Sequence, residues 1–279
     1  MPLKGLNPDL STLKALHRAH AFNIPFSSLD VIAWDYEPRL FVNDDEHLSY
    51  SNDKVITQAL GGSCYDTNIL FMRALKEIGF EVHLMQGRVV LMNPEAAKSH
   101  VILKVVIDNT PYLVDVSLGI AGLIEPIKLE VNDDIQQDYM KYQLEKNNGI
   151  YSFNAMMQGQ WKTCYTFLES EDVKMMDVHF ISYARTEQER SKEKGTIMAS
   201  IFTSDGLVVL LGDSLTKDLM VFSRTASEDK VLKLNINTDA KFKNVCDEYF
   251  GIKVPNSKQT IFDGIESSND SQPLLAQVV

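Results

Sequence analysis

The sequence has few cysteines and no pattern that would pair them. Only Cys64, Cys164 and Cys246 occur in 279 residues, and none belongs to a C-x-x-C pair. An odd number of widely spaced cysteines argues against a disulfide framework and against a zinc site. We therefore expect free thiols in a reducing, cytoplasmic compartment, and no metal.

Long apolar runs and an excess of basic charge are also missing. No stretch approaches the ~18 apolar residues needed to cross a bilayer, and residues 1–10 lack the apolar centre of a signal peptide. Lys and Arg number 27 against 38 Asp and Glu, which gives a net charge of −11. Such a surface repels phosphate backbones and anionic lipids, so we expect neither nucleic acid nor membrane as a partner.

Several common motifs are absent as well. There is no Walker loop, G-x-G-x-x-G, H-E-x-x-H or G-x-S-x-G, which excludes the commonest nucleotide, metalloprotease and serine-hydrolase sites. His17 and His20 would share a helix face, but no third metal ligand lies near them in the sequence. We expect both histidines to be structural.

What is present is an ordinary globular composition, 44% hydrophobic and 23% charged, with a change of pattern along the chain. Helical spacing appears first, then short β-branched and aromatic runs, then one further helix. The expected helices cover residues 11–22, 63–78 and 239–250. Strands are expected within 81–210, including FISYA (180–184), with a hairpin turn at 204–206, a solvated loop at 187–195 and a poorly ordered end from 266.

Cys64 has the surroundings of a nucleophile. It follows Gly61-Gly62 and falls in the first turn of the 63–78 helix, where Ser63 and Asp66 form an S-x-x-D capping box. The positive end of a helix dipole favours a thiolate. Cys164 and Cys246 lie in apolar surroundings and are better explained as core residues.

A base and an orienting acid for Cys64 are available in one predicted hairpin. His100 begins the strand VILKVVI, and Asp115 lies in the returning strand PYLVDVSL. If Asp108 and Asn109 form a two-residue turn, His100 faces Ser117 and Asp115 is a diagonal neighbour on the same face. A three-residue turn would reverse that parity. The hairpin therefore supports a Cys-His-Asp arrangement without proving it.

Three stretches resemble the arylamine N-acetyltransferases. TLKALHRAHAFNIPFSSLDV is similar to the family's amino-terminal helix and I-P-F-E-N-L segment. GGSCYDTNILFMRALKEIGFEV is similar to R-G-G-x-C-F-E-x-N, and SHVILKVVIDNTPYLVDVSLG to H-x-x-L-x-V followed by Y-L-V-D-V-G-F-G. The resemblance covers about residues 11–120, and the order and spacing of Cys, His and Asp also fit that family.

The resemblance implies roles and a fold. Cys64 would be the acyl-accepting nucleophile, His100 its base and Asp115 the residue that orients His100. The implied α+β fold has a helical bundle (1–82), a central antiparallel β-barrel (83–195) and a carboxy-terminal α/β lid and tail (196–279) around a cysteine-protease-like core. The implied reaction is ping-pong transfer from acetyl-CoA to an arylamine, hydrazine or N-hydroxyarylamine, as in xenobiotic metabolism, without a metal.

The chain also departs from the family pattern. Leu60 replaces the Arg before Gly-Gly, so another group must hold the loop before Cys64. Asp66 replaces a Glu, and Leu118 replaces a Phe that lines the family's acceptor pocket. Phe26 matches the aromatic of I-P-F, and with Leu118 it is our candidate for substrate binding. The stretch between residues 29 and 61 is long enough to add a loop, and no coenzyme A contacts are assigned.

Other functions fit the same residues. Transglutaminase-like or papain-like hydrolases also use Cys, His and Asp or Asn in this chain order. A family-related amide synthase, or a ligand-binding member that has lost turnover, are further alternatives. The acyl donor and the acceptor distinguish these possibilities.

Overall fold

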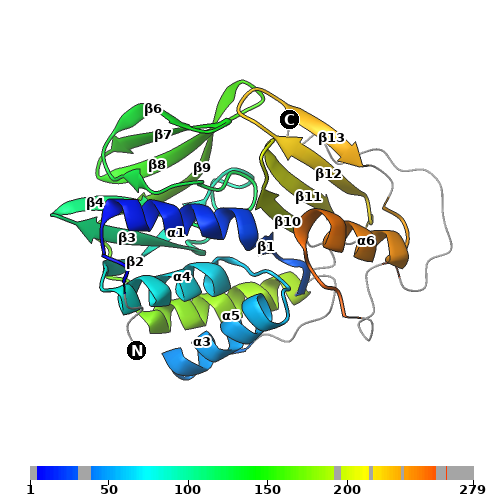
Figure 1. The fold of residues 1–279 in the computed structure, drawn as a ribbon, viewed down its shortest axis with the longest axis horizontal. Coiled ribbons are helices and arrows are strands. Elements are labelled where there is room, and N and C mark those ends of the chain that lie inside the picture. The colour runs from blue at the N-terminus through cyan, green and yellow to red at the C-terminus, as the bar shows by residue number, and fades with distance from the viewer. Residues whose placement is uncertain are drawn as a thin grey trace.

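The computed structural model describes residues 5–30, 39–191, 196–213, 216–233, 236–255 and 262. The predictions for the end of the chain from residue 266, and for the loop at 192–195, lie outside the described residues. The described chain forms helices and two antiparallel sheets, as the α+β prediction requires (Figure 1).

The described helices are α1 (Leu10–Asn23), α3 (Asp44–Asn52), α4 (Cys64–Ile78), α5 (Met175–Ser191) and α6 (Asp239–Phe250), with one π-helical turn, η1 (Asp53–Thr57), directly after α3. Three of them, α1, α4 and α6, begin and end close to where the sequence predicts them, whereas α3 and α5 match no predicted helix. Asp9 caps α1, and Gly79 and Gly251 end α4 and α6 with positive φ angles of 109° and 65°. Part of the predicted loop between residues 29 and 61 is therefore helical.

The larger sheet has eight strands and is curled but open. Its strands are β2 (Glu81–Val89), β3 (His100–Ile107), β4 (Thr110–Val114), β5 (Ile127–Lys128), β6 (Asn132–Gln137), β7 (Met140–Asn147), β8 (Ile150–Met157) and β9 (Gln160–Leu168). They run in the order β5-β4-β3-β2-β9-β8-β7-β6, and no described pairing joins β5 to β6. The expected closed barrel is thus a half-barrel.

The β3–β4 hairpin has the predicted register. Ile107 pairs with Thr110 and Leu103 with Val114, while Asp108 and Asn109 have φ angles of 48° and 61°. Two consecutive positive φ angles define the two-residue turn that suits a twisted hairpin. One detail differs, because β4 ends at Val114 and Asp115 lies one residue beyond the strand.

The smaller sheet joins distant parts of the chain. Its order is β1 (Phe26–Ser27), β10 (Thr196–Phe202), β11 (Leu207–Asp213), β12 (Leu219–Arg224) and β13 (Asp229–Lys233). The predicted turn at 204–206 is confirmed by the Phe202–Leu207 pair. Because β1 pairs with β10, the I-P-F segment is fixed against the carboxy-terminal sheet.

The strand predicted for residues 180–184 is wrong, since these residues belong to α5. Val178 and His179 face inward, whereas Phe180 and Tyr183 are 58% and 39% exposed, so the aromatic residues do not form one buried strand face. Asp177 accepts a hydrogen bond from the backbone N–H of Lys174 at 2.9 Å and thereby stabilises the first turn. Residues 187–191, expected in a loop, extend this helix.

Three apolar clusters hold these elements together. One lies between α4 and strands β2 to β4, one inside the curled sheet, and one between α6 and the smaller sheet. In Figure 1, α3, α4 and α5 lie together on one side of the sheets. Among the described helices, none combines the length and the apolar character that a membrane span requires.

Candidate active site

Cys64 is the first residue of α4 and is 7% exposed. Asp66 accepts hydrogen bonds from the backbone N–H of Ser63 at 2.9 Å and from its hydroxyl at 3.1 Å, which fixes the residue before Cys64. The Cys64 Sγ lies 3.9 Å from the carbonyl oxygen of Ser99. The predicted position in the first turn, with Asp66 as the capping residue, is therefore confirmed.

The two glycines before Cys64 are required by close contacts, at Gly61 with the backbone of Pro25 and at Gly62 with the side chains of Asp66 and Val55. The N–H of Ser27 donates to the carbonyl of Gly62 at 3.0 Å, and the N–H of Gly62 donates to the carbonyl of Pro25 at 3.3 Å. Gly61 has a φ of 67°, and a Cβ there would lie 2.6 Å from the Pro25 oxygen. The I-P-F segment and the Gly-Gly turn are thus held together as one unit beside Cys64.

His100 and Asp115 meet as the hairpin predicted. His100 Nε2 lies 2.7 Å from Asp115 Oδ2, and the two residues are 4% and 1% exposed. The Cys64 thiol lies close enough to His100 to contribute to raising its pKa. The structure therefore brings Cys64, His100 and Asp115 together in one place.

The charges of His100 and Asp115 stabilise each other. Burial alone lowers the pKa of His100, but the Asp115 carboxylate and the contact with Cys64 outweigh it and raise that pKa to about 10. Burial raises the pKa of Asp115, but the His100 charge and hydrogen bonds from His100, Asn68 and Ser117 lower it overall. These contacts favour the imidazolium form of His100 and the carboxylate form of Asp115.

Asn68 connects the pair to α4. It lies one helical turn after Cys64, is fully buried, and donates from Nδ2 to Asp115 Oδ1 at 3.0 Å. Its Oδ1 accepts the backbone N–H of Val116, also at 3.0 Å. Asn68 was not among the predicted site residues, although its i, i+4 spacing from Cys64 could have placed both on one helix face.

A buried lysine stands next to the capping carboxylate of α4. Lys54, in η1, is 4% exposed, and its Nζ lies 2.9 Å from Asp66 Oδ2 and 2.5 Å from Asp30 Oδ2. Burial lowers the pKa of Lys54, but the two carboxylates outweigh it and raise that pKa. Leu60 itself is buried in the apolar cluster of the smaller sheet. Lys54 therefore places a buried cation beside the capping carboxylate of α4.

Phe26 and Leu118, the candidates for substrate binding, line the same small cavity. Its volume is about 20 Å³, and it lies between α1, the loop after Asp115 and strand β10. Phe26 forms a backbone bridge with Gly62, two residues before Cys64. A Cβ at Gly119 would lie 2.6 Å from the Phe26 ring, so the glycine after Leu118 is needed for this arrangement. The cavity has room for a water-sized group as it stands.

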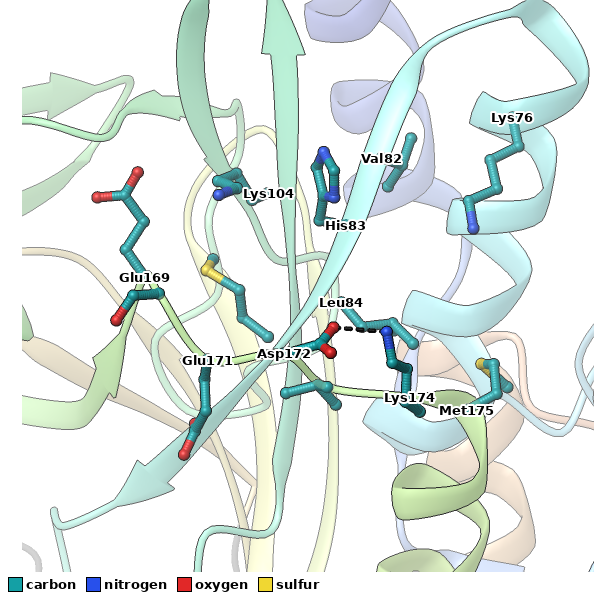
Figure 2. Close-up of a pocket in the computed structure, with 13 residues that line it drawn as sticks. Lys76, Val82, His83, Leu84, Lys104, Glu169, Glu171, Asp172, Lys174 and Met175 are labelled. Atoms are coloured by element: carbon teal, nitrogen blue, oxygen red, sulfur yellow. Dashed lines mark hydrogen bonds and ion pairs between the residues drawn. The ribbon is translucent and has the colours of Figure 1, made fainter.

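A larger cavity of about 480 Å³ lies elsewhere, and none of Cys64, His100 and Asp115 lines it. Figure 2 shows charged side chains of both signs around it, with Lys174 paired to Asp172 at 2.6 Å. Glu171, another lining residue, pairs with Lys98. Because several of its charged lining residues are already paired, we assign no ligand to this cavity.

His17, His20, Cys164 and Cys246 are core residues. His17 Nδ1 lies 3.0 Å from the carbonyl oxygen of Ile124, and His17 and His20 both meet the edge of Phe71. Burial raises the pKa of Cys164 and of Cys246 to about 12, which keeps both thiols protonated. Among the described residues no cluster of three or more His, Cys, Asp or Glu side chains has the arrangement of a metal site.

This fold and site are those of an acyl-transferring enzyme family. A family model described as N-acetyltransferase matches residues 9–259 of the chain, so the protein belongs to that family. Among curated relatives, an arylamine N-acetyltransferase of Mycolicibacterium smegmatis is 35% identical over 167 residues, which are 57% of this chain and 58% of that protein. Over this match the chain spans little more than half of the relative's length.

Longer matches agree with this assignment. The arylamine N-acetyltransferase of Mycobacterium bovis is 28% identical over 255 residues, 89% of this chain and 84% of that protein. The structure of the Mycobacterium marinum arylamine N-acetyltransferase, solved in complex with CoA, has a TM-score of 0.76 and 25% identity, covering 89% of each chain. The resemblance to the arylamine N-acetyltransferases is confirmed.

Proposed function

We propose that the protein transfers an acetyl group from acetyl-CoA to an arylamine, hydrazine or N-hydroxyarylamine through a thioester on Cys64. The observation that supports this most strongly is the Cys64–His100–Asp115 arrangement with its 2.7 Å contact between His100 and Asp115. A charged imidazole beside a thiol at a helix N-terminus favours the thiolate, which is the nucleophilic form. In this proposal the three residues form a cysteine-protease-like core.

In the first half-reaction, the Cys64 thiolate attacks the carbonyl carbon of acetyl-CoA. The bond from that carbon to the CoA sulfur breaks, and the departing CoA thiolate takes up the proton of the His100 imidazolium. Cys64 is then acetylated, CoA leaves as a thiol, and His100 is neutral. The Asp115 carboxylate keeps the ring oriented throughout.

In the second half-reaction, the acceptor nitrogen attacks the thioester carbon. The bond to Cys64 Sγ breaks, and His100 takes the proton that the nitrogen loses, which restores the imidazolium and the thiolate. Acetylation has by then removed the Cys64 contribution that raises the pKa of His100, so the ring is a better-matched base in this step.

We place the acceptor against Phe26 and Leu118. Their cavity is too small for an aromatic ring without movement of its lining side chains. Leu118 is 8% exposed, and the Leu118→Ala variant enlarges this space. We expect it to change the acceptor KM several-fold while the rate of Cys64 acetylation by acetyl-CoA stays the same. Equal effects of Leu118→Ala on both half-reactions would contradict the proposal that Leu118 contacts the acceptor.

The decisive test of the function is the intact mass of the protein after incubation with acetyl-CoA alone. We expect the mass of one acetyl group to be added, to be released by an arylamine, and to be absent in Cys64→Ala. Cys164 and Cys246 remain in that variant and serve as internal controls. Acetylation that persists in Cys64→Ala would contradict the assignment, and amide hydrolysis without acetyl-CoA would favour a thiol hydrolase.

A cytoplasmic location, a role in xenobiotic metabolism and the division at residues 82/83 and 195/196 remain predictions. The proposed partners are an arylamine-type acceptor and coenzyme A, and the net charge of −11 disfavours nucleic acid.

A further inference from the structure

Three buried charges lie at the start of α4. Asp30 and Asp66 are 3% and 4% exposed, and both contact the Nζ of Lys54. Asp66 Oδ1 also accepts a hydrogen bond from the Ser51 hydroxyl at 3.2 Å. Two carboxylates and one ammonium leave a formal charge of −1 beside the residue that precedes Cys64.

This charge matters because a thiolate at Cys64 is also an anion. A carboxylate in the first turn of a helix stabilises the turn, but it competes with any other anion for the positive end of the helix dipole. Without Lys54, the two carboxylates would oppose a negative sulfur at Cys64. Charges in such a buried place are weakly screened, so the effect of one cation is large.

Lys54 is the second residue of the π-helical turn η1. The π-helical turn η1 closes with a 2.8 Å hydrogen bond from the Gln58 N–H to the Asp53 carbonyl. A π-turn widens the helix and shifts the side chains that follow, and such turns recur at functional sites. Directly after it, Ala59 adopts a φ of 53°, which costs a non-glycine residue free energy.

We propose that Lys54 is a positioning residue for Cys64, which offsets Asp30 and Asp66 and so maintains both the first turn of α4 and a local potential that favours a thiolate. This inference rests on the proposed nucleophilic role of Cys64. It goes beyond that role, because Lys54 lies outside the Cys64–His100–Asp115 arrangement and has no contact with the reacting atoms.

Other titratable groups surround the cluster. His47, from α3, interacts with Asp66, but burial lowers the pKa of His47 to about 4, so it is neutral above pH 5. Tyr50 lies with its ring 6.0 Å from the Lys54 Nζ. His100 and Asp115, from the curled sheet, form the other charged pair near Cys64. On the α4 side the charged groups of this cluster are therefore Lys54, Asp30 and Asp66.

The test is the pH profile of Cys64 alkylation by iodoacetamide, followed by mass spectrometry of the Cys64 peptide. We expect the midpoint to rise in Lys54→Met and to fall in Asp30→Asn, each by on the order of one pH unit. The double variant Lys54→Met/Asp30→Asn restores the net charge of −1, and its midpoint should return to that of the natural protein.

The matched control is Lys76→Met, which removes an exposed lysine in the last turn of α4, about 18 Å along the helix from Cys64. Its midpoint should not move. An unshifted midpoint in Lys54→Met would overturn the proposal, and so would a double variant that behaves like Lys54→Met, because only the loss of contacts would then matter.

If Lys54→Met does not fold, Asp30→Asn still decides the question. It keeps the Lys54–Asp66 contact, and a midpoint that does not fall would overturn the proposal. Alkylation needs no acetyl-CoA, so a protein that forms no acetyl-thioester would refute the proposed function while the alkylation profiles still test Lys54.

Discussion

His100 and His17 are buried to nearly the same degree, 4% and 0% exposed, yet their pKa values shift in opposite directions. Burial lowers the pKa of both rings. For His17 it prevails and brings the pKa to about 4, because the Nδ1 partner is the neutral carbonyl of Ile124. For His100 the Asp115 carboxylate prevails, and the pKa rises to about 10. A buried carboxylate, and not burial, distinguishes the candidate active site from the core.

Two further histidines extend the comparison. The pKa of His20 is lowered to about 3 by burial and by the nearby His17, and no described group hydrogen-bonds to either ring nitrogen of His20. His47 stacks on Phe41 with ring centres 4.3 Å apart. These rings contribute as apolar side chains, and of the buried residues His17, His20, His47 and His100 only His100 lies within hydrogen-bonding distance of a described carboxylate.

The largest loss of activity is expected from Asp115→Asn, which removes the carboxylate that distinguishes His100 from the core histidines. An amide leaves the size of the side chain unchanged but removes the charge that stabilises the His100 imidazolium and permits the wrong ring tautomer. We expect acetyl transfer to fall by about 10³-fold or more, by analogy with the corresponding change in a serine-protease triad. Steady-state kinetics with a saturating arylamine measures this.

The matched control for that change is Asp108→Asn. Asp108 is exposed in the β3–β4 turn, where Asn is well tolerated at a positive φ. Its activity should remain at that of the natural protein. A loss in Asp115→Asn no greater than in Asp108→Asn would show that the carboxylate does not determine the state of His100.

A smaller effect is expected from Asn68→Ala, which leaves Asp115 charged but removes its 3.0 Å contact with α4. The rate of Cys64 alkylation should fall by about 10- to 100-fold, because the base is less well positioned. Asn154→Ala is the control, since Asn154 is also buried but bonds to Gln143 and Glu145. Equal alkylation rates in the two variants would reduce Asn68 to a structural role.

The smallest effect concerns stability. The pKa of His20 is lower in the folded state than its ordinary value of 6.5, so the unfolded chain binds the proton more readily and stability falls as the pH drops from 6.5 towards 3. In His20→Leu we expect the slope over this range to decrease by up to about 1.4 kcal/mol per pH unit. Urea unfolding at several pH values measures this, and above pH 7 the slopes should coincide.

The pH dependence of stability has the opposite sign for His100. Its pKa is raised in the folded state, so its contribution is fully present below pH 6.5 and disappears as the pH rises through about 10. In His100→Gln, stability should change less steeply between pH 7 and 10 than in the natural protein. If His20 and His100 affected stability over the same pH range, the distinction between the core histidines and the candidate active site would be contradicted.

Much of the site could be predicted because its rules are local. Capping residues and a following glycine delimit α4, and the two-residue turn at Asp108 and Asn109 fixes which side chains of the hairpin share a face. Those rules place Cys64 in the first turn of α4 and His100 within reach of Asp115, as the structure has them. The family resemblance then supplied Phe26 and Leu118, which the structure places beside one cavity.

What the sequence did not reveal depends on contacts between distant segments. Nothing in NDKVIT indicates that Lys54 is buried, because its partners Asp30 and Asp66 lie on other elements. The segment 180–184 has aromatic and β-branched residues typical of a strand, yet helix α5 leaves Phe180 and Tyr183 exposed. Whether the eight-stranded sheet closes is likewise decided by its two edge strands and not by any local pattern.

The most direct test of the account is the protonation state of the histidine rings by ¹⁵N NMR at pH 7. We predict that His100 carries protons on both ring nitrogens, while His17, His20 and His47 are neutral, and that Asp115→Asn converts His100 to the neutral form. A neutral His100 in the natural protein at pH 7 would contradict the central claim that the buried Asp115 carboxylate creates the charged catalytic pair.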